Sequence, residues 1–290
     1  EDTTAGDSEV DIFKPAAAGE NIRLRGEDVQ VGTSLLSKGR RITPGDIGLL
    51  AATGIDFVRA HSRPSVAVLS TGDELVEPGE PLGPGQIYNS NGYMLCSLLG
   101  THGATPQFLG VARDDPEDLR TRLEAASGFD MVLTSGGVSV GVHDLVKDIL
   151  SDMGDIFFWK VAIRPGKPLA FGLLDTTPLV GLPGNPGASF VGFFQFVLPA
   201  LRKLAGRKDV VPKTEKAVLK EPLTKKRGLL YCMKMSLTTE NGRLHAGLSG
   251  GQGSGMLLST SGADALALLP EDRESFEAGE EVEVQPVDAD

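Results

Sequence analysis

The segment DMVLTSGGVSVGVHD, residues 130–144, decides the fold. It begins with an apolar run at residues 131–133, breaks into glycines and small hydroxyls, and continues with apolar residues at helical spacing to residue 150. Glycines let backbone N–H groups approach an anion, and the N-terminus of a helix adds partial positive charge. The segment therefore predicts a strand–turn–helix unit that binds a phosphate group. A glycine-rich turn without a ligand is the alternative.

Strand and helix patterns alternate on both sides of this segment, over residues 63–206. The expected strands cover residues 65–70, 106–111, 131–134, 155–161, 169–174 and 179–182. The expected helices cover residues 90–101, 116–126, 143–153 and 186–204. This alternation predicts an α/β domain with a mostly parallel, helix-covered sheet. Ligands bind beyond the C-terminal ends of the strands in such sheets, and glycine-rich turns follow residues 70, 133 and 182.

We expect residues 1–62 to form an incomplete N-terminal linker or subdomain. This region is too small to bury a core of its own. Its first 20 residues are polar and acidic, which is typical of a disordered end. Residues 21–36 alternate in polarity and contain two glycines, which favours short strands and turns. Thr43 followed by proline predicts the start of a helix that ends at Gly54.

Residues 207–290 form the third predicted region. Short alternating segments are separated there by Gly, Pro and Asn turns, which predicts a small all-β, barrel-like domain. A helix-like insert is expected at residues 254–259.

The bulk composition excludes several functional classes. A net charge of −11 and a pI of about 4.9 disfavour a nucleic-acid partner. The longest apolar run, residues 190–201, is short for a membrane span and contains Gln195 and Pro199. Cys96 and Cys232 are too few for a disulfide framework or a zinc quartet. We therefore expect a cytoplasmic protein that binds neither nucleic acid nor membrane.

Four polar clusters lie at the ends of expected strands. Together they contain three separated carboxylates and three cations. The carboxylates are those of Glu74, Asp114 and Asp144, and the cations are those of Lys160, Arg164 and Lys167. Carboxylates hold Mg²⁺ and cations neutralise phosphate oxygens, so the set suits a highly charged anion with a divalent metal. Singly, an Asp at a helix start is more often a cap, and a Lys more often a solvated surface residue. The four histidines show no metal spacing, and no Ser-His-Asp or Cys-His order emerges, which disfavours nucleophilic catalysis.

Six motifs now occur in an order that identifies a family. They are STGDEL (70–75), PLGPGQIYNSN (81–91), DDPEDLR (114–120), TSGGVSVGVHD (134–144), FWKVAIRPGKPLAFG (158–172) and GLPGNP (181–186). Over about residues 19–287 the chain resembles the molybdopterin molybdenumtransferase family, which includes MoeA and the E domain of gephyrin. The resemblance implies a molybdopterin-binding α/β domain and a C-terminal barrel-like domain. It also implies molybdate insertion into adenylylated molybdopterin with release of AMP, Mg²⁺ as cofactor, a homodimer, and a molybdopterin adenylyltransferase as a further partner.

The resemblance also assigns residues. Glu74, Asp114 and Asp144 would be catalytic and would hold the metal near molybdate. The substrate-binding set would be Thr71, Gly72, Asp73, Ser135, Gly136, Gly137, Ser139, Gly141, Lys160, Arg164, Gly166, Lys167, Pro183, Gly184 and Asn185.

Three departures from the family pattern bear on activity. The family's N-terminal Asp-Gly-Tyr-Ala segment is absent, so we expect an N-terminally truncated chain whose own turnover is in doubt. Ala188 stands where the family usually has Ser, with Ser189 next, which displaces a hydroxyl expected near molybdate. Arg164 stands where Lys is common, which keeps the charge and alters the donor geometry.

Two other functions remain open at this point. One is a molybdopterin adenylyltransferase-like or competence-damage-like enzyme that shares the central domain. The β region after residue 213 and the helix at residues 43–54 speak against it. The other is a non-catalytic molybdopterin-binding or scaffold module.

Overall fold

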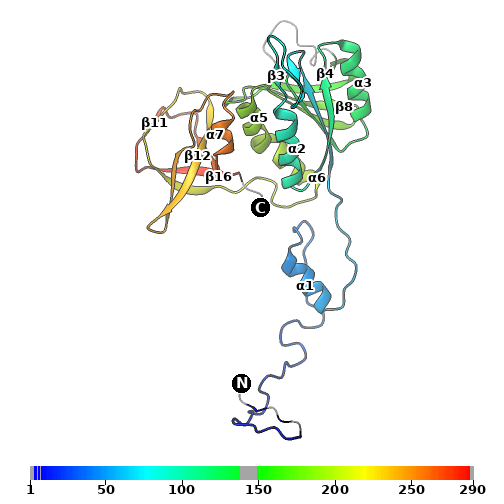
Figure 1. Ribbon diagram of the computed structural model, residues 1–290, viewed down its shortest axis with the longest axis vertical. Helices are drawn as coiled ribbons and strands as arrows, with labels where there is room; N and C mark the ends of the chain where they lie inside the picture. Colours follow the sequence, from blue (N-terminus) through cyan, green and yellow to red (C-terminus); the bar gives the residue numbers. More distant parts are fainter. Residues whose placement is uncertain (1–2, 5, 7, 138–148, 150, 288–290) are drawn as a thin grey trace. The chain divides into compact units, whose positions relative to one another are not determined.

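The computed structural model describes residues 3–4, 6, 8–137, 149 and 151–287, with the side chain of Trp159 left out. Figure 1 shows the course of the chain. The chain separates into two compact units, Glu1–Val58 and Arg59–Asp290. Among the described residues, no helix is long and apolar enough to cross a membrane.

The first unit contains the predicted helix, α1 (Pro44–Ala52). Thr43 caps it with a capping box: the Asp46 N–H donates to Thr43 Oγ1 at 3.3 Å, and the Thr43 N–H donates to Asp46 Oδ2 at 2.9 Å. The hydrogen bond from the Thr43 backbone is the main cause that lowers the pKa of Asp46. Of the short strands and turns predicted for residues 21–36, the turns are confirmed and the strands are wrong. That stretch forms turns instead, because Gly26 and Gly32 adopt positive φ values and interrupt each short extended run.

A six-stranded sheet forms the centre of the second unit, in the order β4–β1–β5–β9–β8–β6. Its strands are β1 (Ser65–Thr71), β4 (Thr105–Ala112), β5 (Met131–Ser135), β6 (Gly154–Lys160), β8 (Pro168–Leu174) and β9 (Thr177–Leu182). The first four in spatial order are parallel, as predicted. β8 runs antiparallel to β9 because only two residues, Asp175 and Thr176, connect them, and a two-residue connection can join only antiparallel strands. β6 is antiparallel to β8 and therefore points the same way as β9.

Helices cover both faces of this sheet (Figure 1). They are α2 (Asn91–Thr101), α3 (Pro116–Ala126), α5 (Pro186–Gly192), the π-helical segment η1 (Phe193–Val197) and α6 (Leu198–Leu204). Alternate residues of β1 face opposite sides: Val66 and Val68 belong to the core under α2, α5 and α6, whereas Ala67 and Leu69 belong to the core under α3. The expected helix at residues 186–204 is continuous, and its π-helical part directly precedes α6. Pro199 has no N–H with which to complete the regular ladder there.

The C-terminal region is all-β and barrel-like, as predicted, and the structure shows that five of its strands form a closed barrel. It consists of β10 (Glu215–Leu219), β12 (Leu230–Glu240), β13 (Arg243–Leu248), β14 (Ala265–Leu269) and β16 (Glu281–Pro286). The pairing of β12 with β13 closes the ring. The short pairs are β2 (Leu75–Val76) with β3 (Ile87–Tyr88), and β11 (Leu223–Thr224) with β15 (Ser275–Phe276). The helix expected at residues 254–259 lies later, as α7 (Leu258–Ser261), because residues 250–256 form a glycine-rich loop.

One short strand joins the α/β part to the barrel. β7 (Ile163–Arg164), from the connection between β6 and β8, pairs in parallel with the start of β12. The barrel is thereby hydrogen-bonded to the segment that carries Arg164. We propose that the boundary between the α/β domain and the barrel domain lies after residue 206.

Candidate functional site

The ends of four parallel strands lie at one edge of the sheet. Thr71 of β1 pairs with Ala112 of β4, and Ser135 of β5 pairs with Leu182 of β9. The Gly136 N–H continues this alignment by donating to the Leu182 carbonyl oxygen at 3.1 Å. The turns that follow the strands are therefore neighbours, as the sequence predicted for the polar clusters.

Two glycines permit close approach at this edge. Gly136 has a φ of 93°, and a Cβ atom on it would lie 2.5 Å from the carbonyl oxygen of Thr71. Gly72 has a φ of 140°, and a Cβ atom there would lie 2.5 Å from the carboxylate of Glu74. At Gly136 the neighbour is backbone, so only glycine fits there, whereas at Gly72 the neighbour is the end of the flexible Glu74 side chain and the positive φ is what favours glycine. The Glu74 carboxylate consequently folds back over the end of β1.

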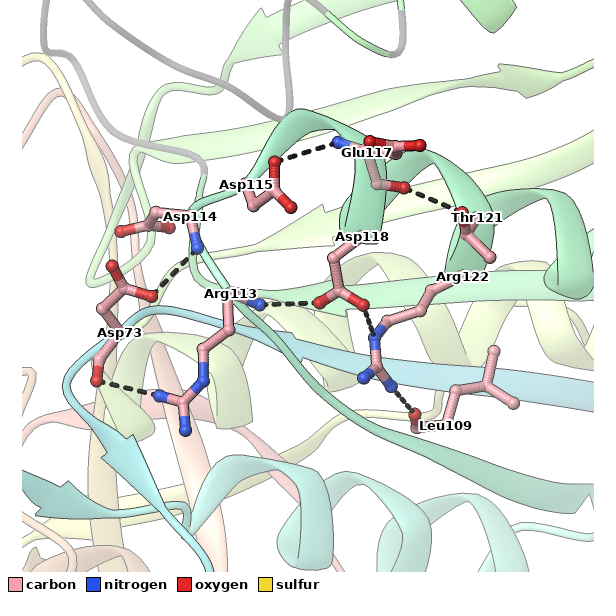
Figure 2. A network of polar contacts seen from close by, with 9 residues as sticks. All are labelled: Asp73, Leu109, Arg113, Asp114, Asp115, Glu117, Asp118, Thr121 and Arg122. Carbon is pink, nitrogen blue, oxygen red and sulfur yellow. Dashed lines mark hydrogen bonds and ion pairs between the residues drawn. The ribbon is translucent and has the colours of Figure 1, made fainter.

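Two loops form the acidic corner of the edge (Figure 2). The Asp114 N–H donates to Asp73 Oδ1 at 3.1 Å, and Arg113 Nη1 donates to the Asp73 carbonyl oxygen at 3.1 Å. The side chains of Glu74 and Asp114 are exposed and form no hydrogen bond or ion pair with a described residue. Both carboxylates are thus available to a ligand. Within the described ranges, no three His, Cys, Asp or Glu residues cluster so as to hold a metal by themselves.

Asn91, which the sequence analysis did not select, links two of the turns. It begins α2 and is 7% exposed. Its Nδ2 donates at 2.8 Å both to Ser135 Oγ and to the Gly184 carbonyl oxygen. Its Oδ1 and the Thr71 Oγ1 are buried and have no hydrogen-bond partner among the described atoms. This edge therefore holds polar groups with unused hydrogen-bonding capacity, as a ligand site requires.

The basic residues lie at the same edge, because β6 ends there and β8 begins there. The Val161 N–H donates to the Lys167 carbonyl oxygen at 3.0 Å and closes the loop that follows Lys160. Lys160, Arg164 and Lys167 are exposed, and none forms an ion pair with a described residue. The Arg164 guanidinium lies 5.6 Å from the ring centre of Tyr231 in β12, so the barrel helps to orient it.

The barrel also contacts the turn after β9. The Gly187 N–H donates to the Ser254 carbonyl oxygen at 2.7 Å. Beside this contact, the side chain of Lys234 is 1% exposed, and its Nζ donates to Ser259 Oγ at 2.7 Å and to the Met256 carbonyl oxygen at 3.2 Å. Burial lowers the pKa of Lys234 below its ordinary value. The sequence pattern of this barrel segment predicts structure only.

Three family profiles match consecutive parts of the chain. "MoeA N-terminal region (domain I and II)" matches residues 1–54, "Probable molybdopterin binding domain" residues 67–203, and "MoeA C-terminal region (domain IV)" residues 216–287. The chain is 39% identical over 270 residues to a molybdopterin molybdenumtransferase of Haemophilus influenzae and covers 67% of that protein.

The chain belongs to the MoeA family of molybdopterin molybdenumtransferases.

Other MoeA relatives agree with this assignment. The chain is 38% identical over 291 residues to molybdopterin molybdenumtransferase 2 of Mycobacterium tuberculosis, covering 98% of this chain and 71% of the relative. The solved structure of a molybdopterin biosynthesis MoeA protein from Pyrococcus horikoshii superposes with a TM-score of 0.81 at 35% identity, covering 99% of this chain and 70% of that one. The chain thus spans roughly two thirds of the length of these MoeA proteins.

The structure places most of the predicted MoeA site residues at one edge of the sheet. Ser139, Gly141 and Asp144 lie outside the described residues. One departure from the family pattern has a structural outcome. Ser189, next to Ala188, is fully buried, and its hydroxyl donates to the Pro183 carbonyl oxygen. That hydroxyl therefore supports the turn before α5.

Asn185 and Gly166 support the same region. The carbonyl oxygen of Asn185 accepts the N–H groups of Ala188 and Ser189, each at 3.0 Å, while its side chain makes no capping bond and is exposed. Gly166 has a φ of 109°, and a Cβ on it would lie 3.5 Å from the Ala188 carbonyl oxygen. The loop that carries Arg164 is therefore packed against the beginning of α5.

Proposed function

We propose that this chain acts in molybdenum cofactor biosynthesis by inserting molybdate into adenylylated molybdopterin with release of AMP. The proposal rests on one observation above all. Carboxylates and cations that form no ion pair with a described residue converge with glycine turns on a single sheet edge of a MoeA-family chain. That combination suits a reaction in which an oxyanion is placed beside a substrate that carries a phosphoanhydride.

The basic residues and the glycine turns would bind the anionic parts of the substrate. Lys160, Arg164 and Lys167 supply charge that no described acid neutralises. Because Gly136 has no side chain, the backbone of its turn can lie close to Thr71. This leaves room for a phosphate oxygen near the turn. A cleft of about 580 Å³ opens on the other side of Arg113, and its lining includes Glu77, Tyr93 and Arg122 but none of the proposed site residues.

The acidic corner fits the Mg²⁺ that the family resemblance implies. Mg²⁺ in phosphate-processing sites is commonly held by one or two carboxylates together with substrate phosphates and water. Glu74 and Asp114 provide two exposed carboxylates that have no partner among the described residues, and Asp144 is the proposed third. When bound, the ion would neutralise charge on the phosphoanhydride. The chain's own contribution is to hold the reacting groups in place with fixed charges around them.

The proposal includes three further elements, of which the first two come from the family resemblance and the third from the composition. They are a homodimer, a molybdopterin adenylyltransferase that supplies the adenylylated substrate, and a cytoplasmic location. The two free thiols of Cys96 and Cys232 suit a reducing compartment.

Molybdate-dependent AMP release from adenylylated molybdopterin, with Mg²⁺ present, tests the function directly. We expect Glu74→Gln and Asp114→Asn each to reduce AMP release by about 100-fold or more, because each removes a charge at the reacting centre. Glu124→Gln, an exposed acid on α3, is the matched control and should retain wild-type activity. Wild-type rates in both site variants would exclude the proposed roles.

Calorimetry with the same substrate separates binding from chemistry. Binding without AMP release would show that this chain holds the substrate and that turnover needs more than this chain. Absence of both would exclude the proposed function for the chain alone.

A further inference from the structure

Near the beginning of α3, the side chain of Asp118 accepts a hydrogen bond from a residue that precedes the N-cap. Asp115 is the N-cap, and its Oδ1 accepts the Glu117 N–H at 3.3 Å. Asp118, at the third helical position, accepts the N–H of Arg113 at 3.0 Å. A residue at this position ordinarily bonds back to the cap residue itself. Here the bond reaches two residues further, into the loop that carries Asp114.

Arg122 holds Asp118 in this orientation. Arg122 Nε donates to Asp118 Oδ1 at 2.8 Å, and Arg122 Nη1 donates to the Leu109 carbonyl oxygen in β4 at 2.7 Å (Figure 2). The two side chains are 34% and 30% exposed, so solvent screens the pair less than it screens a fully exposed one. A continuous set of contacts therefore runs from β4 to the backbone of Arg113.

Arg113 extends this set of contacts into the loop after β1. The Arg113 side chain binds the Asp73 backbone, and the Asp73 side chain binds the Asp114 backbone. These two hydrogen bonds run in opposite directions between loops about 40 residues apart in sequence. Glu74 directly follows Asp73, and Asp114 directly follows Arg113, so each bonded segment carries one of the unpaired carboxylates.

We propose that Arg113 and Asp118 are positioning residues that fix the carboxylate of Asp114 relative to that of Glu74. The role of the two carboxylates rests on the proposed function. Neither positioning residue needs to touch the substrate. Asp118 acts through the backbone of Arg113, and Arg113 acts through the backbone of Asp73. Loss of either contact frees one loop from the other and widens the range of separations between the two carboxylates.

Hydrogen–deuterium exchange of the whole chain, read on peptides that cover residues 72–76 and 112–118, tests the mechanical part. We expect Asp118→Ala to increase exchange roughly tenfold or more in both loops, as loss of a charge-assisted hydrogen bond implies. Asp118→Asn keeps an oxygen acceptor for the Arg113 N–H and should preserve most of the protection. Glu124→Ala, on the same helix and without a side-chain hydrogen bond or ion pair to a described residue, should change neither loop.

Arg113→Gln provides a second route, because it cuts the contact to Asp73 and leaves the contacts within α3 intact. It should increase exchange at residues 72–76 without a change at the centre of α3. In AMP release, both Asp118→Ala and Arg113→Gln should raise the molybdate or Mg²⁺ concentration for half-maximal rate by about fivefold to tenfold.

The outcomes distinguish this inference from the proposed function. Faster exchange confined to α3 in Asp118→Ala, with residues 72–76 unchanged in Arg113→Gln, would overturn the coupling between the loops. If the wild-type chain releases no AMP, the proposed function fails while the exchange measurements still decide the coupling. Coupled loops with unchanged half-maximal concentrations would refute the positioning role.

Discussion

Gly136→Ala is the substitution for which the structure makes the sharpest prediction. An alanine held at a φ of 93° costs about 1–2 kcal/mol, because its Cβ crowds the backbone in the left-handed region. Its Cβ would also lie 2.5 Å from the Thr71 carbonyl oxygen, which belongs to a central strand that cannot move freely. Overpacking of this kind typically costs about 1–3 kcal/mol. The two effects together predict a loss of roughly 2–5 kcal/mol in the free energy of unfolding.

Two other glycines are matched controls. A Cβ on Gly184 would meet only the Gly136 Cα at 3.7 Å, an ordinary contact, and the φ of Gly184 is not in the left-handed region. Gly100 lies in α2 with open space around a Cβ. We expect both alanine variants to be as stable as the wild type or more stable by about 0.4–1 kcal/mol, because alanine restricts the unfolded chain.

Urea unfolding, followed by circular dichroism, measures all three variants on one scale. Gly184→Ala also tests the function of the turn, since it should fold normally while a Cβ at the sheet edge hinders a bound phosphate. The reasoning is refuted if Gly136→Ala unfolds within about 0.5 kcal/mol of the wild type, the range of ordinary surface substitutions. It is equally refuted if Gly184→Ala is the more damaging of the two.

Two further predictions concern polar groups next to the sheet. Asn91→Asp keeps the shape of the side chain but removes the donor to Ser135 and Gly184, so we expect a loss of about 1–3 kcal/mol in urea unfolding, with wild-type stability as the contrary result. The backbone N–H of Ser65 is the first cause that lowers the pKa of Asp130, and the Ser65 hydroxyl adds to it. This stabilisation is complete above the carboxyl's unfolded pKa of about 3.9 and is lost as the pH falls through the lower folded pKa. Asp130→Asn should therefore weaken the decrease of the melting temperature with falling pH below about pH 4. An unchanged decrease would contradict the role given to Asp130.

The sequence by itself determined the architecture of the α/β part and the edge at which the site lies. Apolar runs of strand length alternate with helical patterns, and local physics ends each element: Asp115 caps α3, Pro116 begins it, and glycines break the chain after β1 and β5. A parallel sheet brings the C-terminal ends of its strands to one edge, so Glu74 and Asp114 could be grouped from the sequence alone.

Only the tertiary structure decided which polar groups meet at that edge. Asn91 bonds Gly184 across 93 positions of sequence, and no local pattern marks such a pair. The hydrogen bond between Gly187 and Ser254 of the barrel likewise joins residues far apart in sequence, and no local pattern marks it. Periodicity reports which face a residue occupies, because burial repeats with the strand or helix period. It does not report the partner, because a hydrogen bond between distant residues depends on how whole elements are placed and on the few ångströms over which donor and acceptor can meet.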